Sequence, residues 1–504
     1  MDLVTTATDT AHDRPDTAND VAAGRHTTAI LAIILISYFM ILLDNSIIFT
    51  ALPTIHTAMH YSTTGLAWVQ DAYTLVFGGL LLLGSRAGDL LGRRRVFLFG
   101  LAAFALASLL VGVAPTGWWL IAARALQGIG VAIVAPSSLS LLTASFPHGK
   151  ARAKAVALYG ATAGIGASLG LVIGGALADW VSWRAGFFLN VPMGIAMIVL
   201  APRYLPETAR RRGRFDLIGA VCATLGVGAL VFAIIHSAQA SWTSPVTIAA
   251  LMAGLVLLVG LVAGERRAAQ PIMPLRLFNS RARVGAYVAR FLYLGAMIGF
   301  FYFGTQYLQG VLGFSAFEAG VAFFPMTVVN IAVAMAIPRL TARFGQGIPL
   351  AAGVALTLIG MAWLSQVTTS SSYWGAVALP MLLIGAGQGL AFAPLTSAGI
   401  AGVDADDAGA ASGLVNTFHQ LGMALGLGVL ITASAHAGSG LSSAPAVLTA
   451  HVDTALATGS ALLVLYLIAA LTLILPTELR SRRRNAGPVS APHALPTLAA
   501  ATTN

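Results

Sequence analysis

The sequence predicts an all-α integral membrane protein with fourteen transmembrane helices, arranged as two pseudo-symmetric six-helix bundles plus two inserted central helices. Of its 504 residues, 57% are apolar and 9% are charged, against about 25% charged residues in a typical soluble domain. Apolar runs of about 17 to 25 residues, long enough to cross a bilayer as helices, recur along the chain. The alternation of period two that marks strands of a membrane barrel does not occur in these runs.

Each predicted helix is an apolar run rich in Gly and Ala, which suits helices that pack closely in lipid because small residues let backbones approach. In chain order the runs are 27–52, 65–86, 96–114, 118–144, 153–178, 185–204, 216–237, 245–264, 284–308, 316–338, 348–366, 374–400, 410–434 and 454–476. Residues 1–26 contain five aspartates instead of the basic segment of a signal peptide, so the first run is expected to remain a membrane helix.

Lys and Arg are distributed unevenly between the two sides of these helices. With the N-terminus inside, 25 of the 28 basic residues fall in inner segments, only Arg184 falls in an outer loop, and Arg124 and Arg290 fall within spans. Cytoplasmic loops of membrane proteins carry such an excess. The sequence therefore predicts a multi-pass protein of the inner (plasma) membrane with both termini cytoplasmic. The membrane topology then explains the net charge of +10, and we expect no nucleic acid as a partner.

The two halves of the chain contain related segments in the same order. Residues 166–171 resemble 422–427, an offset of 256, and Gln127 with Gly128 resembles Gln388 with Gly389. The offset exceeds the length of one six-helix unit, and duplicated helical bundles are typical of transporters. We therefore expect a cytoplasmic N-terminal tail, an N-terminal six-helix bundle, an inserted two-helix segment, a C-terminal six-helix bundle and a cytoplasmic C-terminal tail, at 1–26, 27–205, 206–280, 281–478 and 479–504.

Three ionisable side chains lie within the spans of the N-terminal half: Asp44, Asp71 and Arg124. If Pro53 marks the outer end of the first helix, a rise of about 1.5 Å per residue places all three roughly 9–14 Å below the outer surface. One alternative is a structural ion pair between an Asp and Arg124. We favour the other, in which Asp44 binds and releases a proton and Arg124 tunes it. Asp71 is a second candidate for proton coupling, or serves only at the outer mouth.

Two further segments combine glycine with a specific spacing. The loop between the second and third helices is expected to act as an inner gating motif, with Asp89 meeting a helix N-terminus or an arginine. Its residues are Gly84, Gly88, Asp89, Gly92, Arg93 and Arg94. Run 153–178 contains a glycine series that indicates either a hinge or static close packing. Those glycines are Gly166, Gly170, Gly174 and Gly175.

Together these segments make the chain resemble the fourteen-helix drug:proton antiporters of the major facilitator superfamily. Segment 84–95 resembles the signature between helices 2 and 3, segment 43–53 the first-helix motif, segment 124–130 the helix-4 motif, and segment 182–194 the junction of helices 5 and 6. The resemblance covers about residues 27–478. It implies multidrug or antibiotic efflux, with the proton-coupling acid at Asp44 and the associated arginine at Arg124.

The chain departs from this pattern in helix 5. The family places a proline after a glycine and before a glycine pair, whereas this chain has Leu171 between Gly170 and the pair at 174–175. The effect of that leucine on antiport is left open by the sequence.

Aromatic and amide residues of two C-terminal spans are candidates for binding a hydrophobic or cationic substrate, although aromatics facing lipid are an alternative. The candidates are Tyr293, Phe300, Tyr302, Gln306, Phe324 and Asn330. No metal-binding or ATP-binding motif occurs, so we expect no metal and no cofactor, with a proton gradient as the energy source.

The leading interpretation is a monomeric transporter, not an enzyme, that exports a small molecule in exchange for protons. The alternatives are a proton-coupled symporter for uptake and, less favoured, a membrane-embedded enzyme. A sensor without transport activity is disfavoured because no soluble signalling domain is evident.

Overall fold

A computed structural model describes residues 17–146, 150–207, 210, 216–268, 271, 273–404 and 407–477. Within these ranges the chain consists of helices and their short connections, and no strand is formed. Fourteen helices of the described part are long and apolar enough to cross a membrane, which confirms the predicted fold class. Residues 1–16 and 478–504, which include most of the two predicted tails, lie outside the described residues.

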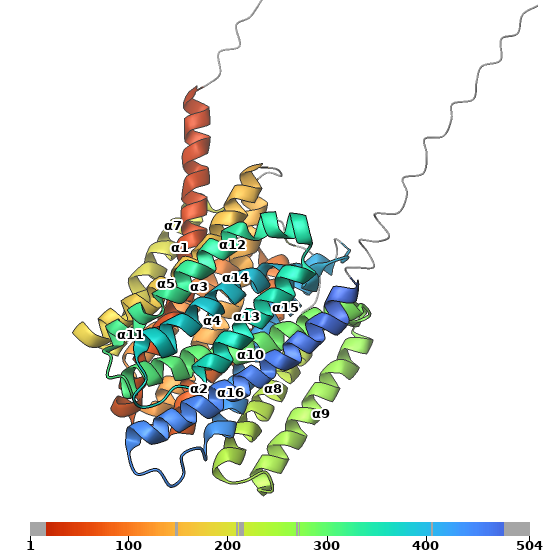
Figure 1. The fold of residues 1–504 in the computed structure, drawn as a ribbon. Helices are drawn as coiled ribbons and strands as arrows, with labels where there is room; N and C mark the ends of the chain where they lie inside the picture. Colours follow the sequence, from red (N-terminus) through yellow and green to blue (C-terminus); the bar gives the residue numbers. More distant parts are fainter. Residues whose placement is uncertain are drawn as a thin grey trace, which may run out of the picture.

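The helices follow one another along the chain as a single bundle (Figure 1). Their bounds are α1 Thr17–Met59, α2 Thr63–Leu91, α3 Arg93–Gly112, α4 Gly117–Ser145, α5 Lys150–Trp180, α6 Trp183–Phe188, α7 Asn190–Tyr204, α8 Leu217–Gln239, α9 Pro245–Arg267, η1 Leu275–Phe278, α10 Arg281–Gly310, α11 Ala316–Ala322, α12 Phe324–Phe344, α13 Gly347–Leu364, η2 Trp374–Ala378, α14 Leu379–Ile400, α15 Ala408–Ser434, α16 Ala444–Ala469 and η4 Ala470–Ile474.

Two predicted spans are each formed by two helices. Leu189 separates α6 from α7, and Phe323 separates α11 from α12. Pro325 lies in the first turn of α12, where its missing N–H breaks no helical hydrogen bond. Each pair still crosses as one candidate span, so the count of fourteen is unchanged.

Two predicted boundaries are wrong. Helix α1 does not end at Pro53 but runs through it to Met59, so Pro53 does not mark the outer end of the span. Helix α16 begins at Ala444, ten residues before the predicted start at 454. The hydroxyl of Ser443 accepts the N–H of Ala446 there, so a local cap starts the helix ahead of the apolar run.

The two halves pack their helices in the same pattern. In the N-terminal half α1 packs on α5, α4 on α2 and α3, and α7 on α1 and α3. In the C-terminal half α10 packs on α15, α14 on α12 and α13, and α16 on α10 and α13. Corresponding helices therefore have corresponding neighbours, as a duplication requires. The bounds proposed for the two bundles remain predictions.

Two equivalent interfaces join the halves. Helix α2 packs on α15, and α5 packs on α11. Helix α8 contacts both α2 and α15, while α9 packs on α8 at the edge of the bundle (Figure 1). The inserted pair therefore covers one of the two interfaces instead of extending either half.

The segment after the inserted pair is fixed to the start of α15. Arg276 of η1 donates from Nε and Nη2 to Asp407 over 2.5 and 2.6 Å. These hydrogen bonds hold the pKa of Asp407, which lies outside the spans, below its ordinary value.

Candidate functional site

A fully buried ion pair lies in the N-terminal half. Arg124 of α4 donates from Nη1 to Oδ2 of Asp44 of α1 over 2.8 Å, and both side chains are 0% exposed. The structure therefore brings together two of the three predicted proton-coupling residues. Burying two charges away from water costs free energy. Removing one partner of such a pair typically lowers the free energy of unfolding by about 3–5 kcal/mol, because the other charge is left buried and uncompensated.

Two amides complete the surroundings of the Asp44 carboxylate. Gln127 of α4 donates to Oδ1 over 3.0 Å, and Asn190 of α7 donates to the same oxygen over 2.7 Å. Both amides also donate to the hydroxyl of Ser108 of α3. Asp44 thus accepts hydrogen bonds from three donors, the set that suits an ionised carboxylate, which is an acceptor only.

The arginine is held by further groups of α2 and α4. Its Nε donates to the carbonyl of Val69 over 3.0 Å, and its Nη1 also donates to Oε1 of Gln127 over 2.7 Å. The guanidinium lies over the ring of Tyr73, 4.2 Å from the centroid, where a cation is attracted by the π face. Five helices of one half therefore converge on a single charge pair.

Gln127 and Asn190 were not assigned a role from the sequence. Both lie in motifs already noted, at 124–130 and 182–194. An amide within an apolar span is the signal that could have identified them, because a buried polar group needs a partner.

Asp71 is not part of this cluster. Its side chain is 0% exposed, and among the described residues neither carboxyl oxygen accepts a hydrogen bond. Helix α2, which carries Asp71, packs on α15 of the other half. Asp71 is therefore a second buried carboxyl, with surroundings that differ from those of Asp44.

The predicted gating loop is tied to its own half. Asp89 pairs with Arg93 over 3.0 Å, and Arg93 also donates to the carbonyl of Ser140 of α4 over 3.3 Å. Arg94 donates from its backbone N–H to Glu207, which follows α7, over 3.2 Å. The expectation that Asp89 meets an arginine agrees with this geometry. These contacts all stay within the N-terminal half, so the gating role of the loop remains a prediction.

The structure forms this predicted loop as the end of α2, Gly92 and the start of α3, and glycine is required at two of its positions. Gly92 joins α2 to α3 with φ of +101°, a conformation that disfavours residues with a Cβ, and Glu207 lies directly against it. A Cβ at Gly84 would overlap the carbonyl oxygen of Ala132, because α2 and α4 touch at this level. At Gly88, by contrast, the nearest atom to a Cβ would be 3.5 Å away.

The helix-5 glycines are packing positions. A Cβ at Gly170 would lie 2.6 Å from the Cβ of Ser46, and one at Gly174 would lie 2.7 Å from the Cα of Ile47. Gly166 likewise faces Leu42 of α1. In the other half, Gly426 of α15 approaches the backbone of α10 in the same way. These contacts favour the close-packing alternative, and a hinge role remains a prediction.

The C-terminal end of α5 joins the two halves on the predicted outer side. Gly175 lies against the carbonyl of Ala316, and the carbonyl of Leu171 faces Gly320 of α11. The carboxylate of Asp179, a residue missed by the sequence analysis, accepts the backbone N–H groups of Ala316 and Phe317 over 3.0 and 2.7 Å. Leu171, at the position of the family proline, is therefore part of this closed interface.

We expect Asp179→Ala to open the outer side. It removes the two hydrogen bonds that Asp179 accepts from the N-terminus of α11. Loss of such a cap destabilises the capped arrangement by about 0.5–2 kcal/mol, which shifts the population toward an outward-open form. Double electron–electron resonance between spin labels at Val181 and Val321, in a Cys222→Ser background, should show a longer-distance component. Glu318→Gln is the matched control, since Glu318 caps α11 from within that helix. An unchanged distance distribution in Asp179→Ala would show that the cap does not hold the interface.

The six predicted substrate residues do not surround one space. Tyr293, Phe300 and Tyr302 are 0% exposed within the packed C-terminal half. Gln306 donates to the carbonyl of Tyr302 one turn earlier in its own helix. Phe324 is 38% exposed, and Asn330 donates to Gln388 over 2.6 Å. Their role in binding substrate is untested.

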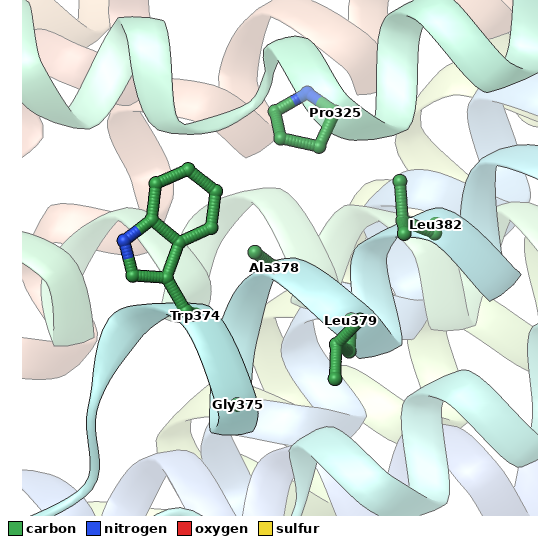
Figure 2. A pocket seen from close by; sticks show the side chains of 6 residues that line it. All are labelled: Pro325, Trp374, Gly375, Ala378, Leu379 and Leu382. Carbon is green, nitrogen blue, oxygen red and sulfur yellow. The ribbon is translucent and has the colours of Figure 1, made fainter.

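An apolar pocket of about 420 Å³ lies between α12, η2 and the start of α14 (Figure 2). Its lining consists of Pro325, Trp374, Gly375, Ala378, Leu379 and Leu382. Trp374 is 74% exposed, as is typical of aromatic side chains at a membrane interface. The lining contains none of the predicted proton or substrate residues, so this groove is separate from the charged site.

Among the described residues, no group of three or more His, Cys, Asp or Glu side chains is arranged to hold a metal ion.

Comparisons with known proteins agree with this architecture. The sequence profile of the Major Facilitator Superfamily matches residues 34–427. The cephamycin export protein CmcT of Amycolatopsis lactamdurans is 39% identical over 462 residues, covering 90% of this chain and 94% of that protein. The puromycin resistance protein pur8 of Streptomyces alboniger is 36% identical over 409 residues, covering 80% of this chain and 81% of that protein.

A solved structure shows the same fold at low identity. A mutant of the nucleoside transporter NupG superimposes with a TM-score of 0.63 at 12% identity, covering 88% of this chain and 99% of that one. The family profile spans most of the chain, and two relatives above 30% identity cover most of it as well. This chain is therefore a multi-pass membrane protein that belongs to the major facilitator superfamily of small-molecule transporters.

Proposed function

We propose that this protein is a secondary active transporter that exports a drug, antibiotic or other hydrophobic small molecule in exchange for protons. The observation that carries the proposal is the buried pair of Asp44 and Arg124, which has no access to water in this conformation. The relatives named for cephamycin export and puromycin resistance support export as the direction and antibiotics as the substrate class.

The geometry suggests how proton binding is coupled to alternating access. Asp44 is held by donors from α4 and α7, whereas α1 also contacts α10 of the other half. A rocking of the halves that moves α1 relative to α4 would separate the carboxylate from Arg124. Without its donors, a buried carboxylate is favoured in the protonated form. Proton uptake and release at Asp44 would then follow the two conformations.

The energy available from this exchange is sufficient for concentrative export. Moving one charge across the membrane is worth about 2.3 kcal/mol per 100 mV, and one pH unit adds about 1.4 kcal/mol. The proposal needs no metal, cofactor or enzymatic step. It includes a monomer in the inner membrane with both termini cytoplasmic, as the Lys and Arg distribution predicts.

The charge of the substrate depends on which buried acids it can reach. The sequence predicts a hydrophobic or cationic substrate, and a cation could displace a proton from Asp44 or Asp71. In the structure the carboxylate of Asp44 already pairs with Arg124. A cationic substrate would therefore pair with Asp71, whose carboxyl oxygens accept no hydrogen bond among the described residues.

The direction of transport separates export from uptake. In inverted vesicles with an acidic lumen, export in exchange for protons predicts substrate accumulation, and a symporter predicts none. A cephamycin, the class of compound named for one relative, is a suitable first substrate.

The role of Arg124 is tested by the pH dependence of export. In Arg124→Ala the carboxyl of Asp44 loses its cationic partner and retains its proton more readily, so the pH optimum of transport in vesicles should move upward. Arg184→Ala is the control, since Arg184 contacts Ala114 and Trp183 on the predicted outer side, away from the charge pair. A variant protein that is folded and has the wild-type pH profile would reduce Arg124 to a structural residue.

A further inference from the structure

The C-terminal half contains a second buried arginine with unusual surroundings. Arg290 of α10 is 4% exposed. Its Nη1 donates to the hydroxyl of Thr396 over 3.1 Å, and its Nη2 lies 3.2 Å from Nδ1 of His419. Because a guanidinium has donors only, Nδ1 must be the acceptor. The guanidinium also lies 3.9 Å from the ring centroid of Phe392.

The other buried arginines of the described chain are either neutralised or surrounded by carbonyls. Arg124 pairs with Asp44, and Arg283 donates to the backbone carbonyls of Leu277, Ala401 and Gly402. Arg290 has neither arrangement. No described carboxylate contacts it, and its Nε has no hydrogen-bond partner. A buried charge without an anionic partner is costly, so its retention calls for a ligand that supplies one.

The position of Arg290 suits a substrate site. Helix α10, which carries Arg290, contacts α1 of the other half, and Tyr38 of α1 stacks on Tyr159 of α5 with ring centroids 4.0 Å apart. Arg290 lies nine residues from the inner end of α10, and Tyr38 eleven residues from Thr27 at the inner end of its span. At about 1.5 Å per residue both are roughly 14–17 Å deep, in the middle region where transporters bind substrate between their halves.

The groups around Arg290 are not fully buried. Tyr38, Tyr159, Thr396 and His419 are each partly exposed, whereas the guanidinium itself is buried. A free Nε–H, a hydroxyl, an imidazole and two stacked rings can hold an acidic group on an aromatic or apolar body.

We propose that Arg290, with Thr396 and His419, binds the carboxylate or similar acidic group of the exported compound. This inference rests on the proposed export function and names its substrate class as amphiphilic acids, including zwitterions. It adds an acidic group to the hydrophobic or cationic substrate that the sequence predicts.

Binding of two dyes to the purified full-length protein tests this site. Rhodamine B carries a free carboxylate, and its ethyl ester is the same dye with that charge masked. Fluorescence anisotropy should show that the wild-type protein binds the acid more tightly than the ester. Arg290→Gln should weaken binding of the acid by about tenfold or more, the loss expected for one charge-assisted hydrogen bond, and change binding of the ester by less than about twofold.

Two further variants separate a local role from a general one. Arg290→Lys keeps the charge and should retain a preference for the acid. Arg343→Gln removes an exposed arginine of α12 and should bind both dyes as the wild type does. If Arg290→Gln does not fold, a competition experiment with the wild-type protein tests the site instead. Benzoate should displace bound rhodamine B at a lower concentration than benzamide does.

Three results would overturn the assignment: a wild-type protein that binds neither dye or prefers the ester, equal weakening of both dyes in Arg290→Gln, or equal displacement by benzoate and benzamide. The assay uses no proton gradient, so its failure is distinct from a failure of proton-coupled export, which the Asp44 variant tests.

Discussion

Asp44→Asn is expected to abolish export driven by a pH gradient, with uphill transport reduced to the level of vesicles that lack the protein. The asparagine has nearly the same shape, and its carbonyl oxygen can still accept a hydrogen bond from Arg124 or Asn190, but it cannot bind and release a proton at physiological pH. The measurement is substrate accumulation in proteoliposomes with an imposed gradient.

The same variant should retain exchange of substrate across the membrane without a gradient, because alternating access itself does not need the titrating group. This second assay separates loss of coupling from loss of folding. Ser108→Ala is a useful control, since it removes a neighbour of the amides without touching the carboxylate. Gradient-driven export at the wild-type rate in Asp44→Asn would refute the assignment of the proton site, and Asp71, the buried carboxyl without a described partner, would be the next to test.

Gly84→Ala is expected to destabilise the protein strongly although it adds only one methyl group. That methyl would overlap the backbone carbonyl of Ala132, and a backbone atom cannot move aside as a side chain can. Helices α2 and α4 would have to separate, and the expected cost is at or above the upper end of the about 1–3 kcal/mol typical of overpacking. The apparent unfolding temperature in detergent should fall.

Gly88→Ala is the matched control, four residues further along α2. There the nearest atom would be 3.5 Å from the new methyl, an ordinary contact with the side chain of Arg93. Its unfolding temperature should stay close to that of the wild type. Equal stability of the two variants would mean that α2 and α4 are not in contact at Gly84.

Much of the architecture could be predicted because the bilayer restricts the choices. An apolar run that crosses lipid must satisfy its backbone internally, so length and composition identify a helix, and the described residues contain fourteen such helices. Two boundaries are wrong, because local chemistry overrides hydropathy there. The sequence suggests a helix end at Pro53, yet α1 continues through it to Met59, and a serine cap starts α16 early.

The chain by itself determined the number of helices, the repeat, and the choice of Asp44 and Arg124 as an acid and a cation at one site, because a charge within an apolar span is rare enough to stand out. Only the tertiary structure determined which residues contact these and the other functional side chains. It provided Asp44 with its two amides, left Asp71 without one, and tied the gating loop to Glu207. It also placed the carboxylate of Asp179 of α5 against the backbone of α11 in the other half. Partners distant in sequence meet only through helix packing, and the sequence of one helix does not state which face of another it will contact.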